Sequence, residues 1–289
     1  MGFIIGPDDF MNKNDSIEIN FFGGSTTECL FVDEEKRFPY LVGEMLSKKI
    51  GKQIIVRNAG VSGKNTMDLT LDFIIRGIPL HPRIVILMEN VNDLSQLMYT
   101  GSYFEGPNTR AIILEAKLER PYYQILRSLK NIIFPNLYRI LKSKIGHETT
   151  TIDEWESWRH DKEIDYNYIE KQYSNAILSF ISLARVHNIE VVLMTQFNRM
   201  NLNDSFIVNN VLANRNKVPP TLFHYHALFN EKMRDISKRE GTLLIDLADS
   251  IPSNSNYIYD AVHLNSAGSE LVAKIIAEKI ESKFYKLNN

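Results

Sequence analysis

Short runs of apolar and β-branched residues recur along the chain and alternate with longer segments whose apolar residues are spaced as on one face of a helix. Five runs have the length of buried strands, and they lie at 17–22, 54–57, 84–88, 190–195 and 242–246. Helical spacing is clear over 38–46, 169–186 and 271–280. This alternation predicts βαβ units, and therefore an α/β fold with a mostly parallel sheet covered by helices on both faces. Functional residues are then expected in the loops beyond the carboxyl ends of the strands.

Two stretches depart from the alternation. Residues 95–167 are rich in aromatic and basic side chains, and Pro121 and Pro135 stand where a helix would begin or kink. We expect a single domain over 1–289 that carries this stretch as a helical insertion or lid. Helices packed on the core and an element that touches substrate or a membrane surface both fit the pattern. The second stretch, 197–220, follows the fourth strand and is rich in loop residues.

Composition narrows the class of protein. The 35 acidic and 33 basic side chains give a net charge of −2, which argues against a nucleic-acid-binding protein. With 44% hydrophobic and 24% charged residues, the 289-residue chain can bury a large core without disulfides or metals. The single cysteine, Cys29, excludes a disulfide framework and a cysteine-based zinc site. Neither a spanning helix nor a signal peptide is visible, so the sequence as it stands is expected to be cytoplasmic unless an anchor precedes it.

A serine follows the first predicted strand at a sharp turn. Gly23 and Gly24 precede Ser25, and a helical pattern begins after it, so the serine is expected at the mouth of the sheet. The start of that helix would direct N–H groups and a favourable dipole at a developing oxyanion. The same residues also fit a plain helix N-cap or a phosphate-binding turn, so this motif alone does not assign a nucleophile.

His263 is the best candidate for a general base. Asp260 lies three residues before it in a polar loop ahead of the last helix, and a carboxylate at this spacing can fix the imidazole tautomer and stabilise the imidazolium. None of the other six histidines has an aspartate at that spacing. His224 and His226 form an H-x-H pair that could bind a metal, but no cysteine or carboxylate cluster accompanies it, so we expect no metal site.

Polar residues also follow the second and third strands. Gly60 lies in N-A-G-V-S-G and Asn92 in E-N-V-N-D. A glycine amide and an asparagine side chain are suitable donors to an oxyanion, although Gly, Asn and Asp are equally common in ordinary turns. In their order along the chain, Ser25, Gly60, Asn92 and the pair Asp260 and His263 resemble the SGNH hydrolases, also called GDSL esterases and lipases.

This resemblance covers almost the whole chain and implies a flavodoxin-like three-layer α/β/α fold with a five-stranded parallel sheet. It implies that Ser25 is the nucleophile, that Asp260 and His263 complete a catalytic triad, and that no cofactor is needed. It also implies an oxyanion hole made by the amides of Ser25 and Gly60 and the side chain of Asn92.

The sequence departs from the family pattern at two positions. Gly24 stands where the family has the aspartate of G-D-S, and Asn90 stands where it has the glycine of G-x-N-D. Asparagine tolerates the left-handed conformation better than most residues, so we expect the turn that presents Asn92 to survive. The variant G-G-S-T-T-E, with R-F-P-Y at 37–40, is similar to SGNH proteins associated with bacterial cell-surface polysaccharides.

These features predict a serine esterase that hydrolyses small acyl esters through an acyl-enzyme, with O-deacetylation of a carbohydrate as the leading activity. An O-acyltransferase that modifies a cell-surface polysaccharide, a lipase, and an inactive binding module of the same fold remain alternatives. The oligomeric state is left open. Cys29 is expected to be a small buried residue rather than a second nucleophile. The candidate substrate contacts are Glu28, Gln196, Asn198 and Arg199.

Overall fold

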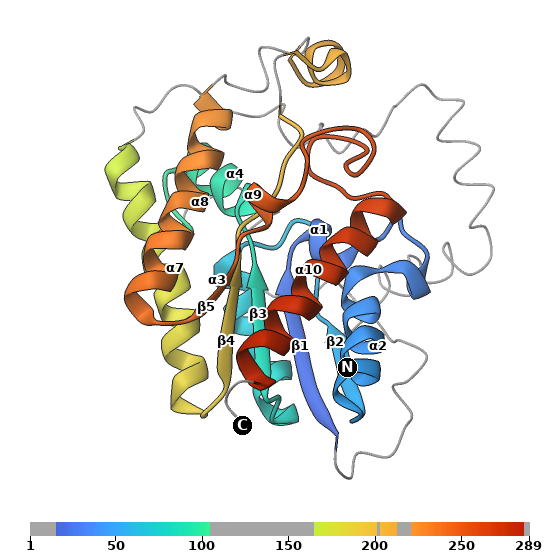
Figure 1. The fold of residues 1–289 in the computed structure, drawn as a ribbon. Helices are drawn as coiled ribbons and strands as arrows, with labels where there is room; N and C mark the ends of the chain where they lie inside the picture. The colour runs from blue at the N-terminus through green and yellow to red at the C-terminus, as the bar shows by residue number, and fades with distance from the viewer. Residues whose placement is uncertain (1–15, 105–164, 201–202, 213–220, 286–289) are drawn as a thin grey trace, which may run out of the picture.

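A parallel five-stranded sheet forms the centre of the molecule (Figure 1). The computed structural model describes residues 16–104, 165–200, 203–212 and 221–285. The strands are β1 (Ile17–Gly23), β2 (Ile54–Asn58), β3 (Ile84–Met88), β4 (Glu190–Met194) and β5 (Leu243–Ile245). The hydrophobic runs predicted each of these strands to within one residue at either end. The predicted α/β fold is therefore confirmed.

The strand order is β2-β1-β3-β4-β5, and every neighbouring pair is parallel. This is the flavodoxin-like order, in which the chain reverses its direction across the sheet between β1 and β3. Gly23 at the end of β1 pairs with Met88 at the end of β3. The loops that follow these two strands therefore emerge side by side, at the position where α/β sheets bind their ligands.

Helices cover both faces of the sheet (Figure 1). Strand side chains alternate between the faces and are buried on both, as expected for a parallel sheet with two helical layers. Phe21 belongs to the layer that holds α2 (Phe38–Ile50) and α10 (Ser266–Tyr285). Phe22 belongs to the opposite layer. That layer is built from α3 (Thr66–Asp72), α4 (Val91–Thr100), α7 (Tyr166–Val186) and α8 (Thr221–Glu240).

Short elements complete the description. At the carboxyl end of the sheet lie α1 (Ser25–Glu28) after β1 and α9 (Leu247–Ser250) after β5. Three-residue 3₁₀ turns occupy Glu34–Lys36 and Ile78–Leu80, and π-helical turns occupy Phe73–Gly77 and Ile207–Leu212. Within the described part of the chain, no helix has the length and apolar character needed to cross a membrane.

The first residues of the expected insertion belong to the core. Leu94, Leu97 and Met98 of α4 are buried against the helical layer that contains α7. The helix therefore continues from the end of β3 to Thr100 as a regular part of the fold. Residues 105–164, including Pro121 and Pro135, lie outside the described residues.

Candidate active site

The turn after β1 brings Ser25 to the carboxyl end of the sheet with almost no space around its backbone. A Cβ atom on Gly23 would lie 2.6 Å from the carbonyl oxygen of Met88, and one on Gly24 would lie 2.1 Å from Nδ2 of Asn92. The contact at Gly23 is with backbone, so this position requires glycine, whereas a side chain at position 24 would require Asn92 and Glu89 to move. Ser25 follows as the first residue of α1, where a helix leaves backbone N–H groups without an intrahelical acceptor.

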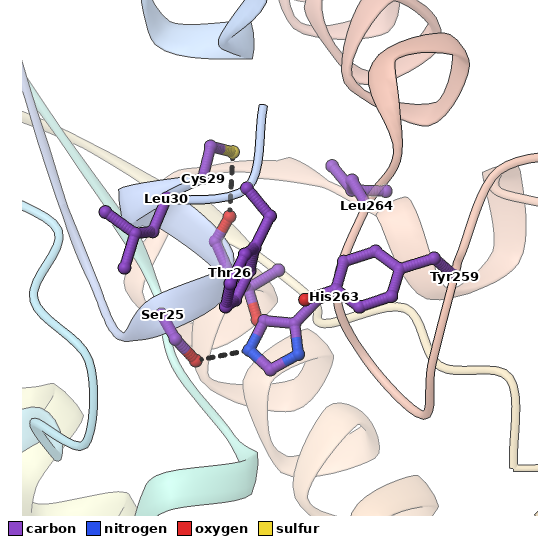
Figure 2. Close-up of a pocket in the computed structure, with 8 residues that line it drawn as sticks. Ser25, Thr26, Cys29, Leu30, Tyr259, His263 and Leu264 are labelled. Atoms are coloured by element: carbon purple, nitrogen blue, oxygen red, sulfur yellow. Dashed lines mark hydrogen bonds between the residues drawn. The ribbon is translucent and has the colours of Figure 1, made fainter. Parts of the chain in front are cut away.

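Ser25, His263 and Asp260 form one continuous chain of hydrogen bonds. Ser25 Oγ lies 2.7 Å from His263 Nε2 (Figure 2), and His263 Nδ1 lies 2.6 Å from Asp260 Oδ2. A carboxylate only accepts hydrogen bonds, so its partner Nδ1 carries the proton and Nε2 is left to accept the serine hydroxyl. The three residues come from the loop after β1 and from the loop before α10, at opposite ends of the sequence.

Asp260 is held in its ionised form. Burial alone would raise its pKa, but the hydrogen bond and charge of His263 outweigh burial and hold the pKa of this carboxyl below its usual value. The backbone amides of Val262 and His263 also donate to Asp260 Oδ1, at 2.9 and 2.8 Å. The carboxylate therefore fixes both its own loop and the imidazole ring.

Arg199 braces the loop that carries Asp260 and His263. Its backbone N–H donates to the carbonyl of Ala261 at 2.8 Å, and its Nη1 donates to the carbonyl of Tyr259 at 3.2 Å. Asp204 accepts from the guanidinium, and the residue as a whole is 8% exposed. The sequence placed Arg199 among the substrate contacts, whereas the structure commits its hydrogen-bonding groups to the protein.

Two of the predicted oxyanion donors, Gly60 and Asn92, lie beside the serine turn, and their N–H groups already have acceptors. The backbone N–H of Gly60 donates to Asn58 Oδ1 at 2.9 Å. The side-chain amide of Asn92 donates to the carbonyl of Lys64 at 2.9 Å and to Glu89 Oε2 at 3.3 Å. A Cβ on Gly60 would lie 2.4 Å from the backbone nitrogen of Glu28, so the loop after β2 packs directly on α1.

Two buried carboxylates, Glu89 and Asp93, lie at the start of α4. Burial raises the pKa of both, and their proximity adds to the rise for Glu89. Asp93 accepts hydrogen bonds from the backbone N–H and the hydroxyl of Thr66 and from the hydroxyl of Tyr103.

Asn90 lies in the turn between Glu89 and Asp93 and has φ −158°, so the expectation of a left-handed residue at this turn is wrong. Its side chain instead fastens the turn to α8 through hydrogen bonds to the carbonyl of His226 and to Asn230.

The other expected substrate contacts also bind the protein itself. Glu28 accepts from the backbone N–H of Ser62 at 2.7 Å, which ties α1 to the loop after β2. Gln196 is buried, accepts from the N–H of Val91 and donates to the hydroxyl of Thr26, and so links the loops after β4, β3 and β1. Asn198 is paired with a ring nitrogen of His226.

The surroundings of the H-x-H pair and of Cys29 do not favour metal binding or nucleophilic chemistry. Burial lowers the pKa of His226 to about 4, which keeps its ring neutral, and His224 is exposed. The described residues contain no group of three His, Cys, Asp or Glu side chains placed to hold a metal. Cys29 is buried, its thiol donates to the carbonyl of Thr26 (Figure 2), and burial raises its pKa to about 12.

A small hollow, open to solvent, lies at the serine and histidine. Exposed apolar side chains form one side of it: Leu30 is 56%, Phe31 69% and Tyr259 37% exposed. The Tyr259 ring stacks on His263 with centroids 5.8 Å apart, and Phe31 meets Tyr259 edge-on. The sequence analysis did not identify these residues. Leu30 and Phe31 are adjacent large apolar residues directly after the serine turn and outside any predicted strand or helix, and this pattern could have indicated an apolar side of the site.

A sequence model of the GDSL-like lipase/acylhydrolase family matches residues 21–271. This span runs from β1 into α10 and contains Ser25, Asp260 and His263. The chain belongs to this family. It is therefore an enzyme of the class that hydrolyses esters, as the sequence predicted. A search of curated proteins finds no match to this acylhydrolase.

Several solved structures share the fold of this acylhydrolase. A catalytic mutant of an acetylxylan esterase from Geobacillus stearothermophilus matches with a TM-score of 0.55 and 16% identity, over 93% of this chain and 96% of that chain. A lipase/acylhydrolase from Enterococcus faecalis has a TM-score of 0.51 and 15% identity, over 92% and 96%. An acetyl xylan esterase named AlAXEase has a TM-score of 0.51 and 18% identity, over 90% and 98%. At these identities the likeness shows the fold alone.

The contacts of Arg199 predict that Arg199→Lys lowers kcat about tenfold with little change in KM. Lysine cannot donate to Asp204 and to the carbonyl of Tyr259 at the same time, as the planar guanidinium does, so the loop that carries His263 is held less firmly. Steady-state hydrolysis of an activated ester measures both constants. Arg185→Lys is the matched control, since Arg185 is about half exposed and pairs with Glu240. A raised KM with unchanged kcat would instead favour the substrate contact expected from the sequence.

The raised pKa of Glu89 predicts a pH-dependent stability. The folded protein holds this proton more tightly than the unfolded chain, whose glutamate pKa is about 4.3. The contribution of Glu89 to the free energy of unfolding is therefore complete at low pH and is lost as pH rises through the folded-state pKa. Urea unfolding between about pH 5 and pH 8 should show a steeper decline for the wild type than for Glu89→Gln. Parallel curves for the two proteins would contradict this prediction.

Proposed function

We propose that this acylhydrolase is a serine esterase that removes small acyl groups, with acetylated carbohydrates as its substrate class. The hydrogen-bonded chain of Asp260, His263 and Ser25 carries the proposal. Such a chain activates a hydroxyl that is otherwise a weak nucleophile at neutral pH. The sequence order of the catalytic residues and the family membership of the chain support the same assignment.

In the proposed mechanism, His263 Nε2 takes the proton of Ser25 as Oγ attacks the ester carbonyl carbon. Asp260 stabilises the imidazolium that results. The imidazolium then protonates the leaving alcohol as the C–O bond breaks, which leaves an acyl group on Ser25. A water molecule, deprotonated by His263, attacks this acyl-enzyme and releases the acid with regeneration of Ser25.

The oxyanion of the tetrahedral intermediate is assigned to the amides of Ser25 and Gly60 and to the side chain of Asn92. In the structure the N–H of Gly60 donates to the side-chain oxygen of Asn58. The side-chain amide of Asn92 donates to the carbonyl of Lys64 and to the buried carboxyl of Glu89. An oxyanion is a stronger acceptor than the amide oxygen of Asn58 or the carbonyl of Lys64, because charge-assisted hydrogen bonds are roughly twice as strong as neutral ones. A small shift of these N–H groups toward the oxyanion is therefore favoured as charge develops.

The shape of the site supports a small acyl group and a ring-bearing alcohol. The hollow at Ser25 and His263 is small and shallow, which suits an acetyl group better than the long chain of a lipase substrate. Phe31 and Tyr259 offer exposed aromatic faces next to His263, where the alcohol would leave. Aromatic faces pack well on the apolar face of a sugar ring. Two enzymes with the same fold are acetylxylan esterases, which is consistent with this class.

The first test compares Ser25→Ala, His263→Ala and the double variant with the wild type on p-nitrophenyl acetate. Each single variant should lose on the order of 10⁶ in turnover, and the double variant should lose little more, because the residues act as one unit. A fluorophosphonate probe should label the wild type and not Ser25→Ala.

The outcomes of this test separate the competing functions. Near-wild-type turnover by Ser25→Ala would refute the serine mechanism. Labelling of the wild type without turnover, together with turnover on addition of a sugar acceptor, would identify an O-acyltransferase. A wild type that shows neither labelling nor turnover would identify a binding module of the same fold.

The aromatic side of the hollow predicts that Phe31→Ala raises KM about tenfold on an acetylated sugar and leaves kcat within twofold, because the lost apolar contact serves substrate and transition state alike. Initial rates on a peracetylated monosaccharide measure both constants. Ile75→Ala is the control, since Ile75 is similarly exposed at 63% and does not line the hollow. Equal KM values for Phe31→Ala and wild type would remove Phe31 from the substrate site.

A further inference from the structure

Glu89 is a fully buried carboxyl that the proposed mechanism does not use. It follows β3 directly and has no exposed surface. Its Oε1 accepts hydrogen bonds from the backbone N–H of Asn90 at 3.0 Å and of Asn92 at 3.1 Å. Its Oε2 accepts from the side-chain amide of Asn92 at 3.3 Å. One carboxyl group therefore contacts both the backbone and the side chain of Asn92.

The position of Glu89 explains the glycine that precedes the nucleophile. Because Gly23 and Met88 are paired and end their strands, Gly24 and Glu89 leave the sheet side by side. A Cβ on Gly24 would lie 2.1 Å from Asn92 Nδ2 and 2.7 Å from Glu89 Oε2. The space that a side chain at position 24 would enter is thus filled by the amide of Asn92 and the carboxyl of Glu89.

We propose that Glu89 is a positioning residue that holds the side-chain amide of Asn92 beside Ser25, from the place that an aspartate at position 24 would otherwise fill. The catalytic consequence rests on the proposed function, in which Asn92 binds the oxyanion. In this sense the carboxyl group that the family pattern has in G-D-S is supplied here by Glu89, which directly precedes Asn90. Gly24 and Glu89 are then a matched pair, since the glycine makes room for the arrangement that the carboxyl maintains.

A carboxyl group suits this task because its two oxygens accept hydrogen bonds from the main chain and the side chain at once, which fixes both the start of α4 and the orientation of the amide. The titratable groups around it are Asp93 of the same helix, Tyr103, and Tyr173 of α7, whose hydroxyl donates to the carbonyl of Glu89.

A double-mutant cycle tests whether Glu89 acts through Asn92. Glu89→Gln keeps the shape of the side chain and turns an N–H donor toward Asn92. We expect it to lower kcat on p-nitrophenyl acetate about tenfold, less than the roughly 10²-fold loss of a whole oxyanion donor in Asn92→Ala, with KM within twofold. In the Asn92→Ala background, Glu89→Gln should have no further effect on kcat, because the group that it positions is gone.

The matched control is Asp93→Asn, which alters the other buried carboxyl of the same helix. Asp93 binds Thr66 and Tyr103 rather than Asn92, so any loss that it causes should be the same with and without Asn92. Thermal unfolding of all variants checks that they are folded. If Glu89→Gln yields too little folded protein, Glu89→Asp, which keeps a carboxyl one methylene shorter, enters the same cycle with the same expected pattern.

Two results would overturn the proposal: a kcat for Glu89→Gln within twofold of wild type, or an equal loss in the two backgrounds, which would indicate a purely structural role. Neither result affects the serine mechanism, because turnover of the wild type that depends on Ser25 is measured in the same assay. Conversely, an Asn92→Ala variant with wild-type kcat would refute the oxyanion assignment and the role of Glu89 together.

Discussion

The close approach of the turns after β1 and β3 is the constraint on which the site depends. The two strands pair up to their last residues, so the chain segments that leave them have no room to diverge. Gly23 has no room for a side chain against the backbone of Met88, and the absence of a side chain at Gly24 lets the turn approach Asn92 and Glu89. Ser25 emerges from this turn at the first position of α1. The position of the serine is therefore set by backbone packing rather than by its own contacts.

Polar side chains then fasten the neighbouring loops to this turn. Gln196 joins the loops after β1, β3 and β4, and Glu28 joins α1 to the loop after β2. Arg199 holds the loop that delivers His263. Burying polar groups is costly unless they are hydrogen-bonded, and each of these side chains has hydrogen-bond partners in the neighbouring loops. The arrangement is a rigid support for a serine and a histidine that must meet at hydrogen-bond distance.

The sequence was sufficient for the features that are encoded locally. Hydrophobic runs predicted the strands because a parallel sheet covered on both faces buries nearly every residue of its central strands. The spacing of Asp260 and His263 reflects a contact within one loop. The roles of Arg199 and Gln196 could not be predicted in this way, because their partners lie about 60 and 170 positions away in the sequence. Both residues follow β4 at the carboxyl end of the sheet. This position alone does not distinguish a residue that contacts substrate from one that holds a neighbouring loop in place.

The conformation of Asn90 could not be predicted for a similar reason. Asparagine in place of a glycine indicates a left-handed turn when only local preferences are weighed, but here the hydrogen bonds of its side chain to α8 determine the backbone. The exposed aromatic residues beside His263 were missed because Tyr259 and Phe31 become neighbours only when the first and last loops of the sheet come together.

The most direct test of the account is to locate the acyl group during turnover. Intact-protein mass spectrometry after a brief reaction with p-nitrophenyl acetate, followed by peptide mapping, reports which residue is acylated. We expect a single acetyl group on the peptide that contains Ser25, and no acetyl group in Ser25→Ala. Acetylation of another residue that rises and decays with turnover, or turnover that continues unchanged in Ser25→Ala, would contradict it.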